Sequence, residues 1–214
     1  MIYRFFPVTY PDIPPLVEIT TTGGGQIRFN PNLYQDGKVC LSLLGTFNAE
    51  DQSQKWNPKY SSLAQVLVSI QTQILVSEPY FNEPGHEARR GTRAGKQGSL
   101  QYNEKIQLAT LRHAIIAHLK HPPPGFEVVC IRHFSFCRKR ILAQARRWTL
   151  ETPQDSTQRI RFERVYNDLL YYLSQKEMKI YKALPPLEDD LRVLRKLDPS
   201  FVHALELVPS DESK

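Results

Sequence analysis

Residues 29–42 read FNPNLYQDGKVCLS, and this stretch decides how the rest of the chain is interpreted. It begins with the turn-forming residues Asn30, Pro31 and Asn32, and Asp36-Gly37 adds a second turn signal. A short apolar run around Cys40 follows. The sequence therefore predicts an irregular, turn-rich segment that carries a cysteine at its end.

The composition of the whole chain limits the class of protein to which it can belong. The chain has 214 residues, 41% of them hydrophobic, which is enough for a core and for one domain with an extension or two small domains. A net charge of +6 permits an acidic partner without requiring one. Three cysteines do not suit a disulfide scaffold. With no apolar run near the ~20 residues of a membrane span, we expect no membrane partner and a cytoplasmic or nuclear location.

A hairpin and two helices are predicted in the first part of the chain. Residues 16–20 form a strand, three glycines at 23–25 interrupt it, and residues 26–29 resume it, so a hairpin is the simplest interpretation. No Gly-Lys-Ser/Thr follows these glycines, which favours a plain turn over a phosphate-binding loop. Apolar residues at helical spacing predict helices over 63–74 and 108–119. Residues 77–98 are predicted to form a loop.

The second half is predicted to be helical. Residues 126–150 are basic and aromatic, and Thr152-Pro153 ends that helix. Residues 158–184 have the spacing of an amphipathic helix, and the chain ends in a polar tail.

Four motifs occur in an order typical of one family. They are PVTYPDIPP at 7–15, the turn segment with Asn32 and Cys40 eight residues apart, WNP at 56–58 and EPYFNEP at 78–84. Together they resemble the ubiquitin-conjugating (E2) enzymes, which have a His-Pro-Asn turn eight residues before the active cysteine. The resemblance is strong over residues 5–85 and weaker to about 120.

Details of the turn segment resemble the large, extended branch of that family, which includes the giant inhibitor-of-apoptosis hybrid of E2 and ubiquitin ligase (E3). Asn30 replaces the usual His, and residues are inserted between Cys40 and Trp56. The resemblance implies an α+β ubiquitin-conjugating (UBC) fold, with a core at 1–120 and a helical extension with a polar tail at 121–214. It also implies that the fold lacks its first helix and strand, an N-terminally truncated core.

The resemblance assigns chemical roles to three residues. Cys40 would accept ubiquitin as a thioester, because a thiolate both attacks and leaves readily. Asn32 would either donate a hydrogen bond to the oxyanion that forms during transfer or brace the loop that holds the cysteine. Glu83 would position the acceptor lysine or accept its proton, or it is simply an exposed loop carboxylate.

Partners also follow from the resemblance. They are ubiquitin or a ubiquitin-like modifier, the activating enzyme (E1), protein substrates and an E3 ligase. Asp12 and Lys59 place charges where many members present an aromatic and a small residue to ligases, so that shared surface is altered. No cofactor is implied. Cys130, His133 and Cys137 offer too few ligands for a zinc site and are interpreted as packing residues.

Two other functions remain open from the sequence. The chain could be a catalytically silent E2-like module that binds ubiquitin or another partner, although such a module needs none of Cys40, Asn32 and Glu83. It could also be a basic adaptor that binds nucleic acid through residues 132–147. No nucleic-acid-binding motif accompanies that stretch, so binding of nucleic acid is not favoured.

Overall fold

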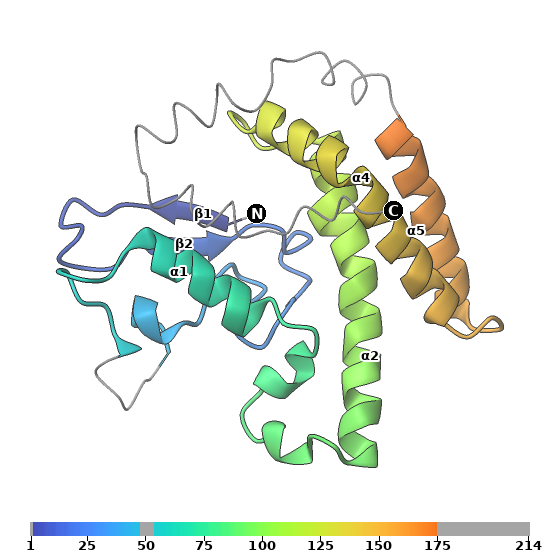
Figure 1. Ribbon diagram of the computed structural model, residues 1–214, viewed down its shortest axis with the longest axis horizontal. Helices are drawn as coiled ribbons and strands as arrows, with labels where there is room; N and C mark the ends of the chain where they lie inside the picture. The colour runs from blue at the N-terminus through green and yellow to red at the C-terminus, as the bar shows by residue number, and fades with distance from the viewer. Residues whose placement is uncertain (1, 48–53, 175–214) are drawn as a thin grey trace, which may run out of the picture. The chain divides into compact units, whose positions relative to one another are not determined.

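The computed structural model describes residues 2–47 and 54–174, and these belong to one compact unit. Figure 1 shows a small sheet and one short helix on one side, with the longer helices beside them. The elements are β1 (Ile2–Phe5), β2 (Leu16–Ile19), α1 (Leu63–Ser69), α2 (Arg93–Ala109), α3 (Ala117–Lys120), α4 (Glu127–Glu151) and α5 (Thr157–Ser174). Short 3₁₀ turns cover Ser42–Leu44, Pro79–Asn82 and Glu87–Arg89. The predicted α+β class is confirmed.

The sheet differs from the predicted hairpin. β2 pairs antiparallel with β1, with Ile2 opposite Ile19 and Phe5 opposite Leu16, and not with residues 26–29. The three glycines at 23–25 have φ values of 60°, 70° and 81°, a conformation that glycine adopts readily. The backbone N–H groups of Gln26 and Ile27 both donate to the Thr22 carbonyl. The chain therefore closes a tight loop after β2, and no second strand forms there.

The turn segment borders β2 directly. The Ile19 N–H donates to the Gly37 carbonyl at 2.9 Å, and Lys38 forms a β-bridge with Glu18. Gly37 has φ +99°, and a side chain there would press on the Ile19 carbonyl. The segment around Cys40 is thus built into the sheet side of the core.

α1 covers this region, as its predicted spacing requires. The Ser62 side chain accepts from the Gln65 N–H while Gln65 bonds back to the Ser62 N–H, which is a capping box. The helix continues as a π-turn over Ile70–Ile74. Its apolar face meets the sheet and the turn segment in one core cluster of nine buried residues: Val17, Ile19, Leu33, Val39, Leu41, Leu44, Val66, Ile70 and Ile74.

α2 begins inside the predicted loop. Thr92 caps it by accepting from the Gly95 N–H at 3.0 Å, so the helix starts at Arg93 and runs on through a π-turn at Thr110–Ile116. Two glycines of the predicted loop, Gly95 and Gly98, lie in this helix at close contacts. A side chain at Gly95 would collide with the Arg89 backbone, and one at Gly98 would collide with the Tyr80 ring.

α4 and α5 pack against each other, and α5 also packs against α2 and the turn at Thr110–Ile116. The residues they bury are Cys130, Phe134, Ala145, Phe162, Val165, Leu169 and Leu173. Both helices agree with the sequence, although residues 175–184 of the second lie outside the described residues. The boundary at 120 coincides with the end of α3 and stays a prediction. Within the described ranges, no helix is long and apolar enough to cross a membrane.

Substitution of two phenylalanines tests whether the packing of α4 and α5 stabilises the fold. Phe162 on α5 is 0% exposed, whereas Phe136 on α4 is 91% exposed. Phe162→Ala should lower the free energy of unfolding by about 3–5 kcal/mol, because it leaves a cavity. Phe136→Ala is the matched control and should change it by less than about 0.5 kcal/mol. Urea unfolding followed by circular dichroism measures both, and equal losses would contradict the packing described.

Candidate functional site

A buried asparagine ties the turn segment to its surroundings. Asn30 is 1% exposed, and its side-chain amide donates to the Ile74 carbonyl at 2.7 Å. Its side-chain oxygen accepts from the Asn32 N–H at 2.8 Å and from the Asn82 side chain at 3.3 Å. One side chain therefore joins the turn, the end of the helix that begins with α1, and the loop that carries Glu83.

Asn32 and Cys40 are held side by side by two hydrogen bonds. The Cys40 N–H donates to the Asn32 carbonyl at 2.8 Å, and the Asn32 side-chain amide donates to the Cys40 carbonyl at 3.1 Å. These bonds are the ones that the bracing alternative for Asn32 requires, and the role of Asn32 stays a prediction. A side-chain amide has two N–H donors, so bracing leaves one for a further acceptor.

The Cys40 thiol is buried in the structure. Cys40 is 6% exposed, and its Sγ donates to the Thr46 carbonyl at 3.4 Å. Thr46 is itself fixed, since its hydroxyl donates to the Val39 carbonyl at 2.6 Å and accepts from the Leu41 N–H at 3.0 Å. The carbonyl that the thiol contacts therefore belongs to the loop directly after it.

Glu83 follows the 3₁₀ turn Pro79–Asn82 and is half-buried. Its carboxylate lies 3.6 Å from an Arg28 guanidinium nitrogen. The neighbouring Asn82 is bonded to Asn30 and, at 2.9 Å, to the Gln73 carbonyl. The loop that bears Glu83 is therefore attached to the same segment that carries Asn32 and Cys40.

Arg28 is a site residue that sequence reasoning missed. Its guanidinium donates to the Pro31 carbonyl at 2.5 Å and stacks on the Tyr34 ring with 4.5 Å to the centroid. The available signal was a cation two residues before the Asn30-Pro31 turn. The Tyr102 hydroxyl on α2 donates to the Arg28 carbonyl at 3.3 Å. Burial raises the pKa of Tyr102 to about 12, so its phenol is protonated in the neutral range.

The Tyr-Pro and Trp motifs meet as packing residues. The Trp56 indole N–H donates to the Pro11 carbonyl at 2.7 Å, and the Tyr10 and Trp56 rings lie 5.8 Å apart. Asp12 and Lys59, next to these contacts, are both exposed. Their charges are therefore presented at the surface.

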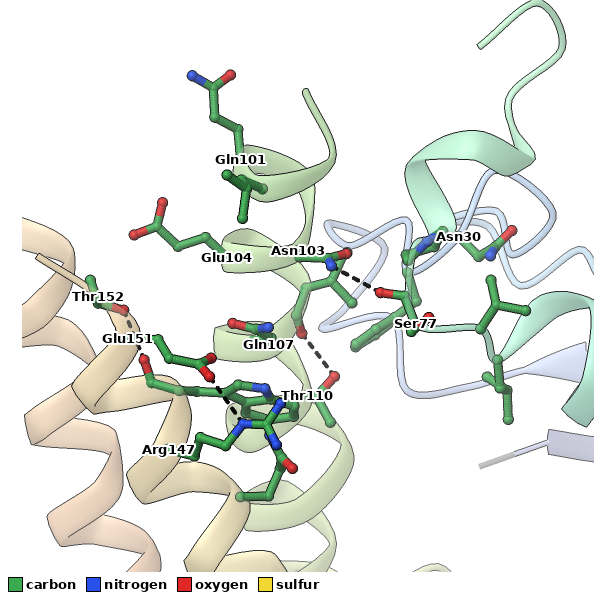
Figure 2. Close-up of a pocket in the computed structure, with 18 of the residues that line it drawn as sticks. Asn30, Ser77, Gln101, Asn103, Glu104, Gln107, Thr110, Arg147, Glu151 and Thr152 are labelled. Atoms are coloured by element: carbon green, nitrogen blue, oxygen red, sulfur yellow. Dashed lines mark hydrogen bonds and ion pairs between the residues drawn. The ribbon is translucent and has the colours of Figure 1, made fainter. Parts of the chain in front are cut away.

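A cleft of about 890 Å³ lies behind the turn segment, between Asn30, α2 and the C-terminal end of α4. Figure 2 shows its polar lining, with Asn103 bonded to the Ser77 carbonyl and Arg147 paired with Glu151. Cys40, Asn32 and Glu83 do not line it. Within residues 2–47 and 54–174, no three His, Cys, Asp or Glu side chains are grouped to hold a metal ion.

Comparison with known proteins identifies the fold. Residues 2–110 match the model of the ubiquitin-conjugating enzyme family. The human dual E2 ubiquitin-conjugating enzyme/E3 ubiquitin-protein ligase BIRC6 is 50% identical over 153 residues, 72% of this chain and 3% of the relative. A probable ubiquitin-conjugating enzyme E2 of Acanthamoeba polyphaga mimivirus is 44% identical over 164 residues, 77% of this chain and 11% of the relative.

A third relative has the same pattern of partial coverage. The probable ubiquitin-conjugating enzyme protein 17 of Caenorhabditis elegans is 52% identical over 144 residues, 67% of this chain and 20% of the relative. The chain thus spans a fifth or less of the length of these three proteins. The predicted resemblance to the extended branch is confirmed. Since the family model covers 109 of the 214 residues, the chain belongs to the ubiquitin-conjugating enzyme family.

Proposed function

We propose that this chain accepts ubiquitin as a thioester on Cys40 and transfers it to lysine amines. The observation that carries the proposal is the segment in which buried Asn30 holds Asn32 against Cys40. In the loading step, the Cys40 thiolate attacks the thioester carbonyl that an activating enzyme presents. A new C–S bond forms as the old one breaks, and the electron pair leaves on the sulfur of the activating enzyme.

Loading requires a local change at Cys40. In the structure its Sγ is bonded to the Thr46 carbonyl, and the residue is buried. A thiol that donates to a carbonyl is not a thiolate, so the hydrogen bond must break before attack. Rotation of the cysteine side chain away from Thr46 breaks this hydrogen bond, and the thiol proton then passes to water, which leaves the thiolate that attacks.

Transfer is proposed to use Asn32 and Glu83. A lysine nitrogen attacks the thioester carbonyl, an N–C bond forms, and negative charge develops on the carbonyl oxygen. The second N–H of the Asn32 amide can donate to that oxygen. The C–S bond then breaks and its electron pair returns to Cys40. The proton from nitrogen goes to the Glu83 carboxylate and from there to water.

The small fraction of neutral lysine amine at pH 7 explains why a carboxylate near the thioester is useful. With a pKa near 10.4, only about one amine in two thousand is neutral at pH 7. Glu83 would orient the neutral amine by accepting a hydrogen bond from it.

Partners of this function are proposed from the family. They are ubiquitin, an E1 that loads it with ATP, protein substrates, and an E3 ligase for which Asp12 and Lys59 alter the usual contact surface. Three free thiols, Cys40, Cys130 and Cys137, suit a reducing compartment such as the cytoplasm or nucleus.

A second candidate is an E2-like module that binds ubiquitin or another partner without catalysis. The burial of Cys40 is the observation in its favour. The two functions differ in whether the chain ever carries ubiquitin covalently.

The nucleophile is tested by cysteine replacement. With E1, ATP and ubiquitin, the full chain should form an adduct that thiol reagents cleave on a gel. Cys40→Ala should abolish it, because no other thiol lies in the turn segment. Cys130→Ala and Cys137→Ala are the controls and should retain it, since both lie on α4. An adduct that survives in Cys40→Ala would contradict the assignment, and no adduct on the unaltered chain would favour the silent module.

The acceptor step is tested at Glu83. Glu83→Ala should slow discharge to free lysine by at least about tenfold. A positioned acid or base typically contributes about a hundredfold or more, so tenfold is a low threshold. Loading of Cys40 should stay near normal, because no amine takes part in it. Glu78 is in the same loop and pairs with Arg90 at 2.9 Å, so Glu78→Ala is the matched control. Lost loading with normal discharge would show that Glu83 instead supports the loop.

A further inference from the structure

Arg28 makes three contacts at once. Its guanidinium donates to the Pro31 carbonyl, lies 3.6 Å from the Glu83 carboxylate and stacks on Tyr34. The side chains of Arg28 and Glu83 are 38% and 40% exposed, so the pair is open to an incoming amine. Both stacking and donation to a backbone carbonyl limit the positions that the guanidinium can take. The cation beside Glu83 is therefore fixed by the turn that holds Asn32 and Cys40.

We propose that Arg28 is a positioning residue that presents Glu83 to the acceptor amine as half of an ion pair and not as a bare carboxylate. The inference rests on the proposed function, in which Cys40 carries ubiquitin and Glu83 meets the amine. It goes further by assigning a charge-balancing role to a residue that does not touch the reacting atoms.

The reason lies in how a neighbouring charge shifts the protonation equilibrium of the lysine amine. A bare carboxylate favours the charged ammonium form of a nearby lysine, whereas a nearby cation disfavours it. An ammonium has no lone pair and cannot attack the thioester. With Arg28 in place, Glu83 can accept a hydrogen bond from the neutral amine without stabilising the ammonium to the same extent.

Other charged and titratable groups near the pair come from three segments. From the loop of Glu83, the His86 backbone N–H donates to the Glu83 carbonyl at 3.0 Å. From the turn segment, Tyr34 lies under Arg28, and Lys38 lies with its Nζ 5.9 Å from the same ring. From α2, Tyr102 bonds to the Arg28 backbone and stays protonated because burial raises its pKa to about 12. Arg28 is the cation that pairs with Glu83, and Lys38 provides a matched cation on the same ring.

The test is single-turnover discharge of preloaded full-length chain to free lysine, measured over a range of lysine concentrations and pH. Using only the loaded fraction makes the result independent of the rate of loading. Arg28→Gln should lower the half-saturating lysine concentration and the maximal rate, each roughly two- to fivefold, the size expected for one exposed charge pair. In its pH–rate profile, the increase of the discharge rate with pH should be shifted to higher pH, because the bare carboxylate favours the ammonium form of lysine. Arg28→Lys keeps the cation and should keep the profile of the unaltered chain.

Two comparisons separate charge balance from a merely structural effect. Lys38→Gln should leave the profile in place. In a Glu83→Gln background, Arg28→Gln should have little further effect, because the carboxylate that it balances is gone.

Three outcomes would overturn the proposal. These are an unchanged discharge in Arg28→Gln, an Arg28→Lys variant that behaves like Arg28→Gln, or the same loss with and without the Glu83 carboxylate. Failure of the proposed function looks different. The unaltered chain would then not load, or Glu83→Ala would discharge normally, before any change at Arg28 was considered.

Discussion

The candidate site depends on the hydrogen bonds of the buried Asn30 side chain. Leaving a buried polar group without its partner costs about 1–3 kcal/mol. Asn30 avoids that cost through its bonds to Ile74, Asn32 and Asn82. These three residues belong to separate segments, so satisfying one side chain positions the turn, the end of the first helical region and the loop of Glu83 together.

The proposed chemistry needs Asn32 to be held in place and the Cys40 thiol to be able to rotate. Asn32 is bonded to the Cys40 backbone, which positions a donor beside the sulfur-bearing residue. The thiol itself is held by the Thr46 carbonyl, outside the Asn30 network. The thiol of Cys40, the proposed nucleophile, can therefore change rotamer while the turn stays fixed. Arg28 joins the two sides of the site through Pro31 and Glu83.

Sequence reasoning succeeded where local signals agree with packing. The helix at 63–74 is predicted from its regular apolar spacing, and that spacing is present in α1 and its continuation, where Ser62 is the cap. It failed where tertiary contacts decide. Gly95 and Gly98 fall in the predicted loop, yet they lie in α2. Arg89 and Tyr80 approach these two positions so closely that glycine is needed there, and this contact cannot be read from the local sequence. The partner of β2 is β1, a choice that local pattern does not determine. The contact of Arg28 with Glu83 joins residues 55 positions apart and has no local signature.

The most direct test of the central claim removes the Asn30 amide and keeps its bulk. Asn30→Leu is close in size, and loading of ubiquitin onto Cys40 can be measured beside the helical signal of the chain. We predict that loading falls at least about tenfold, as expected when a reacting group is misplaced by a fraction of an ångström to an ångström. The helical signal of α4 and α5 should persist, because neither helix contacts Asn30 in the hydrogen-bond network. Loading equal to that of the unaltered chain would show that the Asn30 side chain does not hold the site.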